Sequence, residues 1–362
     1  MAKSTFDVKH TNIAKGFFIL AMVFHHVFAS QMNYWLNLST WGEGETSVLL
    51  TDIALYGKVC VGGFVFLSGY GITKKLMSYA TDPTQDKKLF ISRLTKLYFG
   101  FWPIYIIGII GTILFGNTPL ADYYISATTG KFSWIMPILD ALGLARLFNS
   151  GTLNSSWWYL PVAIIVIFAT PLCYKLYCKF QYSFVIVICM LPYFLGVSAD
   201  MTLLVPIAVL GILFAKEDLF VKIKDLAHKN WGTRILSYIL VLVGVCASYE
   251  LYLASSVIMA LPVSTIACLL FCYLLLADIP LLRSILAFFG KHSANIFYVH
   301  TFLYWYWFPY TIYKLENKFL IYCVVFLGAL AISIVLEFVK KIVRYNKLEQ
   351  SVISHLTRLT CK

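Results

Sequence analysis

Ten long apolar stretches, joined by mostly short connections, constrain this chain more than any other feature of its sequence. A helix needs roughly 20 apolar residues to cross the hydrocarbon core of a bilayer. The pattern therefore predicts an all-α, polytopic integral membrane protein with about ten transmembrane helices. The predicted spans lie near residues 13–29, 53–72, 97–115, 157–174, 180–197, 201–215, 235–253, 257–277, 285–309 and 319–339.

The composition excludes a water-soluble fold. Of the 362 residues, 60% are hydrophobic and only 13% are charged, whereas a soluble domain carries roughly 25% charged residues. Ten spans with their connections use up most of the chain, so no soluble domain of useful size is left. We expect residues 1–345 to form one transmembrane domain and residues 346–362 to form a short basic tail.

The net charge of +12 would suit a nucleic-acid-binding protein, but its distribution along the chain indicates membrane topology instead. If the N-terminus is cytoplasmic, 24 of the 29 Lys and Arg residues fall in inner segments or, as for Lys15 and Lys291, in the inner part of a span, and Lys58 falls within the second span. This bias matches the positive-inside rule. It predicts a multi-pass protein of the plasma membrane with both termini in the cytoplasm and no nucleic-acid partner. Only four basic residues fall outside: Lys131, Arg146, Lys314 and Lys318.

Two predicted outer connections are long enough to have a function, namely residues 30–52 and 116–156. The second contains an apolar run at residues 134–139, which argues against disorder. We expect it to lie as a re-entrant or interfacial segment over the outer mouth of the helices. On the inner side, the basic stretches 73–96 and 216–234 would face cytosolic anions.

The first span carries two ionisable residues on one face, Lys15 and His26. Their separation corresponds to three helical turns plus about 20°, with a rise of roughly 16 Å, whereas His25 points about 80° away. An ionisable residue within a span is a candidate functional residue. The alternative is structural: Lys15 extends to the interface and the histidines form a polar rim at the other end.

Two further motifs are each open to a structural and a functional interpretation. The second span contains Gly62, Gly63, Gly69 and Gly71, which would allow close approach of another helix or of a ligand. Before the third span, Arg93 and Lys96 share a helix face. Such a pair suits a phosphate group, or it anchors the helix at the cytoplasmic boundary.

Aromatic residues and a further histidine mark the outer half of the predicted bundle. Trp157, Trp158 and Tyr159 open the fourth span from the outer side. They are typical of an interfacial aromatic belt, and aromatic faces also stack on sugar rings. His300 lies near the middle of the ninth stretch, where an imidazole without a partner is costly.

Taken together, these residues resemble the integral membrane acyltransferase 3 family. The first helix of that family typically reads Arg-Gly-(apolar)9-His, and its second helix ends in a Phe-Phe-Leu-Ser-Gly-Phe-like run. Arg-x-x-Arg precedes its third helix, and a late helix carries a Ser-x-x-Ile-Tyr-x-x-His-like run. The corresponding landmarks here, in the same order, are Lys15 with His26, residues 64–70, Arg93 with Lys96, residues 157–160, and Ser293 with His300.

The resemblance implies a ten-helix core that moves an acyl group, usually acetyl, from cytosolic acyl-coenzyme A to a hydroxyl group. The acceptor would be an extracytoplasmic glycan, glycolipid or similar molecule. Acyl-coenzyme A (acetyl-coenzyme A) would act as a co-substrate, with no permanently bound cofactor and no metal. The sequence departs from the family at Lys15, which replaces the usual arginine, and at Asn12, where many members have an acid. No C-terminal SGNH hydrolase-like domain is recognisable, so we expect a stand-alone member.

Roles for individual residues follow from the resemblance and from their chemistry. Lys15, Arg93 and Lys96 would bind the phosphates of coenzyme A, and Trp157, Trp158 and Tyr159 would contact the acceptor. His26 would deprotonate the acceptor hydroxyl, because the pKa of imidazole near neutrality suits a general base. His300 is the second catalytic candidate and would orient the donor, the acceptor or the oxyanion. The carboxylate partner of His26 is open among Glu43, Asp140 and Glu250.

Three alternatives stay open on the residues alone. One is a different membrane acyltransferase architecture, built around a buried histidine and a distant asparagine or aspartate. A covalent acyl-histidine or acyl-serine intermediate would also transfer the group. A membrane transporter or channel would use the intramembrane lysine and histidines as an ion pathway. Neither an inverted repeat nor a pair of broken helices is evident in the sequence, which argues against the transporter.

Overall fold

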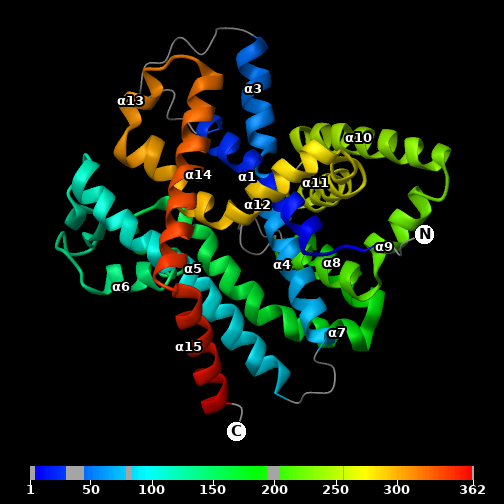
Figure 1. The fold of residues 1–362 in the computed structure, drawn as a ribbon, viewed down its shortest axis with the longest axis horizontal. Coiled ribbons are helices and arrows are strands. Elements are labelled where there is room, and N and C mark those ends of the chain that lie inside the picture. The colour runs from blue at the N-terminus through cyan, green and yellow to red at the C-terminus, as the bar shows by residue number, and fades with distance from the viewer. Residues whose placement is uncertain (1–4, 30–44, 79–83, 195–203, 256, 361–362) are drawn as a thin grey trace. The chain divides into compact units, whose positions relative to one another are not determined.

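The structure is a computed structural model that describes residues 5–29, 45–78, 84–194, 204–255 and 257–360 (Figure 1). Within these residues all regular elements are helices, and the one β-bridge joins Ile125 and Phe132. The helices are α1 (Val8–Phe28), α3 (Glu45–Tyr56), α4 (Val59–Ser78), α5 (Gln85–Phe115), η2 (Leu120–Tyr124), α6 (Ile135–Ala141), η3 (Ser155–Trp158), α7 (Tyr159–Phe194), α8 (Leu204–Lys216), α9 (Leu219–Ala227), α10 (Trp231–Ala254), α11 (Val257–Leu270), η4 (Phe271–Leu275), η5 (Leu276–Asp278), α12 (Pro280–Thr301), η6 (Phe302–Trp307), α13 (Pro309–Tyr313), α14 (Lys318–Ile342) and α15 (Tyr345–Thr360).

Within the described residues, each of the ten predicted stretches is largely helical, although the second crosses the turn between α3 and α4. This confirms an all-α polytopic membrane protein. Among the described residues, seven helices are long and apolar enough to cross a membrane, fewer than the ten predicted. The difference has three causes. The fourth and fifth stretches form one element, α7, which breaks at Gln181 with φ 50° and ψ −132°. The sixth stretch forms the short helix α8, and α12 is not apolar enough to be among the seven, since it carries His292, Asn295 and His300 besides Arg283 and Lys291.

The chain divides into two compact units. The first comprises Met1–Met22, Asp52–Leu89 and Val166–Ser293, and the second comprises Val23–Thr51, Phe90–Ile165 and Ala294–Lys362. The division falls within α1, α3, α5, α7 and α12, so each of these helices contributes residues to both units.

In the first unit, the glycines of α4 allow close helix packing. A Cβ atom on Gly69 would meet the backbone carbonyl of Ala208 on α8, and one on Gly211 of α8 would meet the carbonyl of Phe66. A Cβ atom on Gly62 would meet the hydroxyl of Thr265 on α11. Of the two interpretations of this glycine-rich span, these contacts favour tight helix packing.

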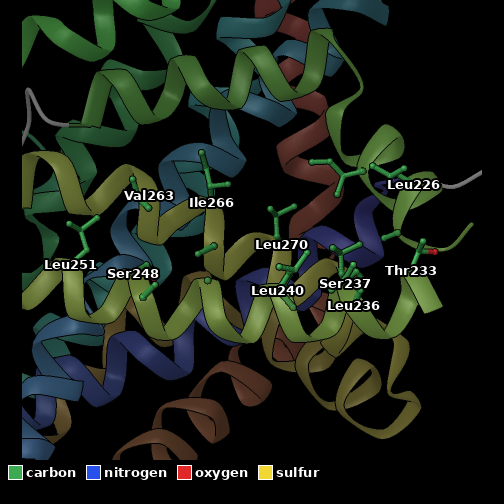
Figure 2. A pocket seen from close by; sticks show the side chains of 17 residues that line it. Leu226, Thr233, Leu236, Ser237, Leu240, Ser248, Leu251, Val263, Ile266 and Leu270 are labelled. Carbon is green, nitrogen blue, oxygen red and sulfur yellow. The ribbon is translucent and has the colours of Figure 1, made fainter. Parts of the chain in front are cut away.

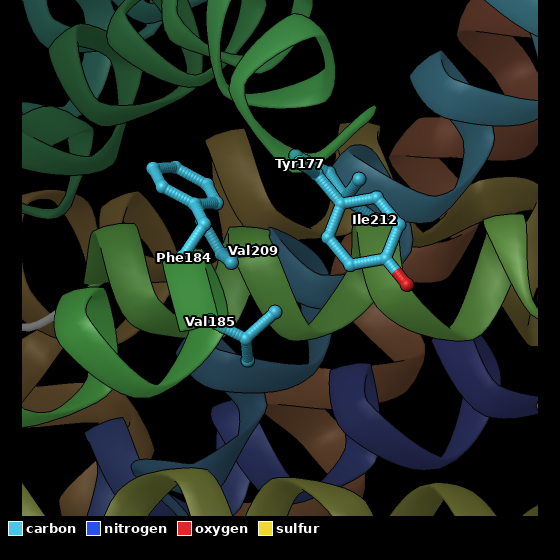
Figure 3. Close-up of a cluster of buried hydrophobic side chains, with 5 residues drawn as sticks. All are labelled: Tyr177, Phe184, Val185, Val209 and Ile212. Carbon is cyan, nitrogen blue, oxygen red and sulfur yellow. The ribbon is translucent and has the colours of Figure 1, made fainter. Parts of the chain in front are cut away.

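Two further features of the first unit involve the helices that pack on one another here and their neighbours. An apolar groove of about 840 Å³ runs along α10 and α11 (Figure 2). On α8, Val209 and Ile212 pack against Tyr177, Phe184 and Val185 of α7 (Figure 3). This cluster includes side chains from both sides of the break at Gln181, so it stabilises the bent helix against α8.

Ion pairs in the first unit join segments that the charge distribution places on the cytoplasmic side. Lys74 at the end of α4 pairs with Asp218 before α9, and Lys175 of α7 pairs with Asp86 of α5. Lys224 of α9 lies 3.3 Å from the carboxylate of Asp278 at the end of η5. The fold of this unit therefore brings predicted inner segments together.

In the second unit, the connection between α5 and α7 is folded around one carboxylate. Asp140 of α6 is 1% exposed and accepts hydrogen bonds from the Tyr124 hydroxyl at 2.9 Å, the Thr152 hydroxyl at 2.7 Å and the Leu153 amide at 2.8 Å. The same connection exposes apolar side chains, including Trp134 at 79%. Such exposure is what an interfacial segment requires, and that location stays a prediction.

The C-terminal segment is helical. Helix α15 covers nearly all of the predicted basic tail, and none of its residues is buried. The assignment of residues 1–345 to a single transmembrane domain stays a prediction.

Candidate active site

Two of the predicted catalytic residues meet in the second unit. His26 lies in the last turn of α1, and His300 lies in the last turn of α12. Their ring centroids are 5.0 Å apart and their planes meet at 80°, so the rings are edge to face. His300 is 0% exposed, whereas His26 is partly buried. Residues that are distant in the sequence therefore form one histidine pair.

Backbone and hydroxyl groups fix the ring of His300. Its Nδ1 atom lies 2.9 Å from the carbonyl oxygen of Phe297 and 3.1 Å from that of Ile296. Because carbonyl oxygens only accept, Nδ1 carries the proton and donates to them. Nε2 then accepts from the hydroxyl of Thr301 at 3.2 Å. The ring has one defined tautomer and orientation, as a positioning group requires.

His26 has a different environment. Within the part of the chain that the structure describes, no hydrogen bond reaches its ring nitrogens, and its ring contacts are with His300 and with His25 at 5.3 Å. Among the described residues, its nitrogens are thus not engaged by another group of the protein. A base must lie within hydrogen-bond reach of the proton that it removes, and His26 is the member of the pair that can meet this condition.

A polar clamp holds the backbone just before His300. The indole N–H of Trp157 donates to the carbonyl oxygen of Tyr298 at 3.0 Å, and the amide of Asn154 donates to the same oxygen at 3.4 Å. Asn154 is 0% exposed and also accepts from the backbone N–H of Ser156 at 2.9 Å. Asn154 was not predicted as a site residue, although Asn before a helix is a recognised capping signal.

The backbone changes geometry directly after His300. Helix α12 ends at Thr301, and the chain continues as the π-helix η6. Short π-helical segments are rare and are frequently found at functional sites. The histidine pair thus lies where a regular helix gives way to a wider one.

The three predicted acceptor residues occupy different environments. Trp157 is 3% exposed, and its ring packs edge to face with Phe101 at 4.8 Å and with Phe302 at 5.7 Å. Trp158 and Tyr159 are partly exposed. Trp157 therefore packs in the interior next to the site, and Trp158 and Tyr159 are more accessible to an acceptor.

The predicted donor residues are placed as follows. Lys15 is partly buried on α1 in the first unit. Arg93 and Lys96 lie on α5 in the second unit, where Arg93 is partly buried and Lys96 is exposed. Both Arg93 and Lys96 lie in the continuous helix α5, three positions apart, so they share a helix face as predicted. Their role in binding a donor stays a prediction.

The three candidate carboxylate partners of His26 also differ. Glu43 lies outside the described residues. Both oxygens of Asp140 already accept hydrogen bonds, and burial raises the pKa of Asp140 to about 6. Glu250 is exposed on α10 in the first unit. No contact of Asp140 or Glu250 with His26 is present among the described residues.

Comparison with protein families supplies one match. The acyltransferase domain model of the acyltransferase 3 family matches residues 11–338, nearly the whole chain. The matched range contains all the candidate site residues. Comparison with curated proteins and with solved structures gives no match.

Proposed function

Because the chain belongs to the acyltransferase 3 family, we propose that it transfers an acyl group, acetyl in the first instance, from acyl-coenzyme A to a hydroxyl group of an extracytoplasmic glycan or glycolipid. The observation that carries this proposal is the histidine pair. Among the described residues, the ring nitrogens of His26 make no hydrogen bond, and His300 beside it is fixed by its neighbours.

His26 acts as the general base in this mechanism. As the acceptor oxygen attacks the thioester carbonyl carbon, the O–H bond breaks and the proton moves to the imidazole. A C–O bond forms, the C–S bond breaks, and the thiolate of coenzyme A leaves and recovers the proton. General-base catalysis of this kind typically contributes 10²–10⁴-fold to the rate.

His300 acts as a positioning residue. The edge-to-face contact between the two rings limits the orientations of the His26 imidazole. The hydrogen bonds from His300 to Phe297 and Ile296, together with the clamp from Trp157 to Tyr298, keep that contact in place. A base held in a fixed orientation reaches the substrate in the reactive geometry more often.

The donor is held by cations at the predicted cytoplasmic boundary. Arg93 forms a planar fork that suits phosphate oxygens, and Lys96 on the same helix adds a point charge. Lys15, which belongs to the other unit, stays a donor residue predicted from the sequence. Coenzyme A brings several phosphate charges, and the family implies an acyl donor. The long pantetheine arm would carry the thioester from these cations towards His26.

The acceptor binds at the predicted outer side of the membrane, near the start of α7. Trp158 and Tyr159 are partly exposed there, and Trp157 supports them from the interior. This placement, together with the positive-inside bias of the sequence, supports a multi-pass protein of the plasma membrane whose acceptor is extracytoplasmic. The family match favours acyl transfer over the ion pathway of a transporter or channel.

Reconstituted vesicles test the proposal. The purified protein is incorporated with a defined orientation, acetyl-coenzyme A labelled in its acetyl group is supplied at the cytoplasmic face, and cell-surface glycans are supplied at the other face. We expect label in base-labile ester linkage on the glycan, at a rate that depends on both substrates. Movement of ions without any transfer of label would contradict the proposal. Mass spectrometry of surface glycans from cells with and without the gene identifies the acceptor.

A further inference from the structure

The apolar groove of the first unit is long. Figure 2 shows its labelled side chains from Leu226 and Thr233 at one end to Leu251 and Val263 at the other. Thr233 and Leu251 lie on the same helix, 18 residues apart, which corresponds to roughly 27 Å. The hydrocarbon core of a bilayer is about 30 Å thick. The groove therefore extends along most of the membrane-spanning length of α10.

The side chains that line the groove are almost all apolar, and their few hydroxyl groups already make hydrogen bonds. The polar side chains among its lining residues are Thr233, Ser237 and Ser248. Each hydroxyl donates to a backbone carbonyl of its own helix segment, at 3.0, 2.7 and 2.9 Å respectively. An occupant of the groove must therefore be apolar over most of its length.

One end of the groove has a basic cluster, which we define as Lys224, His228 and Arg234 around the carboxylate of Asp278. Lys224 and His228 lie 3.3 Å from this carboxylate, and Arg234 lies 3.1 Å from it. The hydroxyl of Tyr238 donates to it at 2.7 Å. Lys224 and Arg234 alone outnumber the single negative charge, so the cluster has capacity for an additional anion.

The basic cluster and the groove share the same turns of the fold. Lys224 follows the lining residue Ile223, His228 follows Ala227, and Arg234 follows Thr233. The side chain of Arg234 is 47% exposed, so it is accessible to a ligand. Trp231 beside it is 79% exposed, as is typical of a residue at the headgroup level of a membrane.

We propose that the groove and the basic cluster together bind one anionic phospholipid of the surrounding membrane. The acyl chains lie along α10 and α11, and the phosphate lies at Arg234 and Lys224. An anionic headgroup on a hydrocarbon tail matches both the charge at one end and the apolar walls beyond it. The positive-inside bias places this end in the cytoplasmic leaflet, where anionic lipids attract basic side chains.

The other candidate occupants fit less well. A second apolar helix would cover the walls of the groove but would bring no anion to the basic cluster at its end. Free phosphate would occupy the basic cluster but leave the groove without an occupant. The proposal involves no reaction step and does not depend on the acyl-transfer mechanism.

Lipid binding to the delipidated, purified full-length protein tests the proposal. Phosphatidylglycerol, phosphatidylcholine and inorganic phosphate are each titrated, and bound lipid is counted by native mass spectrometry alongside the thermal midpoint. We expect phosphatidylglycerol to bind about fivefold more tightly than phosphatidylcholine, because partly exposed charge pairs contribute up to about 1 kcal/mol. Inorganic phosphate at the same concentration should leave the thermal midpoint unchanged.

Two variants separate the groove from the basic cluster. A Cβ atom on Gly244 meets open space, so Gly244→Leu fills the groove without displacing backbone and should weaken binding of both lipids. Gly100→Leu on α5 is its matched control, because a Cβ atom there also meets open space. Arg234→Gln should remove the preference for phosphatidylglycerol, and Lys229→Gln, which removes an exposed charge nearby, should retain it.

Three outcomes would overturn the proposal. Lipid binding by Gly244→Leu equal to that of the unmodified protein would exclude the groove. Stabilisation by inorganic phosphate as large as that by phosphatidylglycerol would indicate a free-anion site. A dimer that carries no lipid and dissociates in Gly244→Leu would assign the groove to a second copy of the chain.

Discussion

The indole N–H of Trp157 donates a hydrogen bond of 3.0 Å to the backbone carbonyl oxygen of Tyr298. This buried bond joins the aromatic motif at the start of α7 to the helix that carries His300, two residues further along the chain. Trp157, which is not a member of the histidine pair, therefore helps to hold the helix that carries His300.

We expect Trp157→Phe to lower kcat while leaving the KM for the acyl donor unchanged. Phenylalanine keeps an aromatic ring against Phe101 and Phe302 but removes the donor. One hydrogen bond contributes about 1 kcal/mol, so the rate should fall roughly fivefold. Trp102→Phe is the matched control, because it removes an indole bond of 2.9 Å to Ala141 in the same unit. An equal loss of kcat in both variants would contradict a specific positioning role.

Arg93→Ala should raise the KM for acyl-coenzyme A much more than the KM for the acceptor. Charge-assisted phosphate contacts are worth about 1.5–3 kcal/mol, which corresponds to roughly a ten- to hundredfold effect. Lys96 is exposed, so Lys96→Ala should have a smaller effect, up to about fivefold. Arg93→Lys should fall between, because the charge survives without the fork.

The control for these changes is Arg146→Ala, which removes an exposed basic residue from the opposite predicted side. Its donor KM should be unchanged. If Arg93→Ala lowered only the amount of inserted protein and left donor affinity intact, Arg93 would be a topological anchor. The donor site would then be sought in residues 216–234.

Asp140→Ala should loosen the connection between α5 and α7. Two buried donors, on Tyr124 and Leu153, and one partly buried donor, on Thr152, lose their acceptor, at a cost on the order of 3 kcal/mol. Asp140→Asn should be much milder, since its amide oxygen still accepts and its amide nitrogen can donate to the Thr152 hydroxyl. Limited proteolysis of residues 116–156 measures the difference. Equal protection of both variants would contradict the role of Asp140 in holding the segment.

The same carboxylate predicts a pH dependence. Burial raises the pKa of Asp140 from its ordinary value of 3.8 to about 6 in the folded protein. The folded state therefore binds the proton more tightly, and this contribution to stability is fully present below about pH 4 and is lost as the pH rises through about 6. Protection of residues 116–156 from proteolysis by an acid-active protease should fall across this range, and Asp140→Asn should flatten the change.

Accessibility of introduced cysteines tests the orientation. Lys87 and Asp122 are both exposed and lie on opposite predicted sides. A membrane-impermeant thiol reagent should label Asp122→Cys in intact cells and Lys87→Cys only after the membrane is opened, with labelling of the parent protein subtracted. Labelling of Lys87→Cys in intact cells would overturn both the orientation and the cytoplasmic placement of Arg93 and Lys96.

The helices could be predicted because hydrophobicity is a local property of the sequence. The boundaries of the helices were harder to predict. The fourth and fifth stretches, for example, form one bent helix because of the backbone geometry at Gln181. The face shared by Lys15 and His26 followed from helical periodicity. The contact of His26 with His300 did not, because no local pattern encodes which faces of distant helices pack together. Asn154 and Asp140 were missed as structural centres for the same reason: their partners come from other segments.

The most direct test of the central claim is acyl transfer by His26→Ala, measured beside His25→Ala in the same vesicles. The ring of His26 packs against that of His300, whereas His25 is predicted to point off that face. We expect His26→Ala to lose transfer by at least about a hundredfold while still binding acyl-coenzyme A, and His25→Ala to keep most of its activity. An inactive His25→Ala together with an active His26→Ala would contradict the account, because the base would then not be the histidine beside His300.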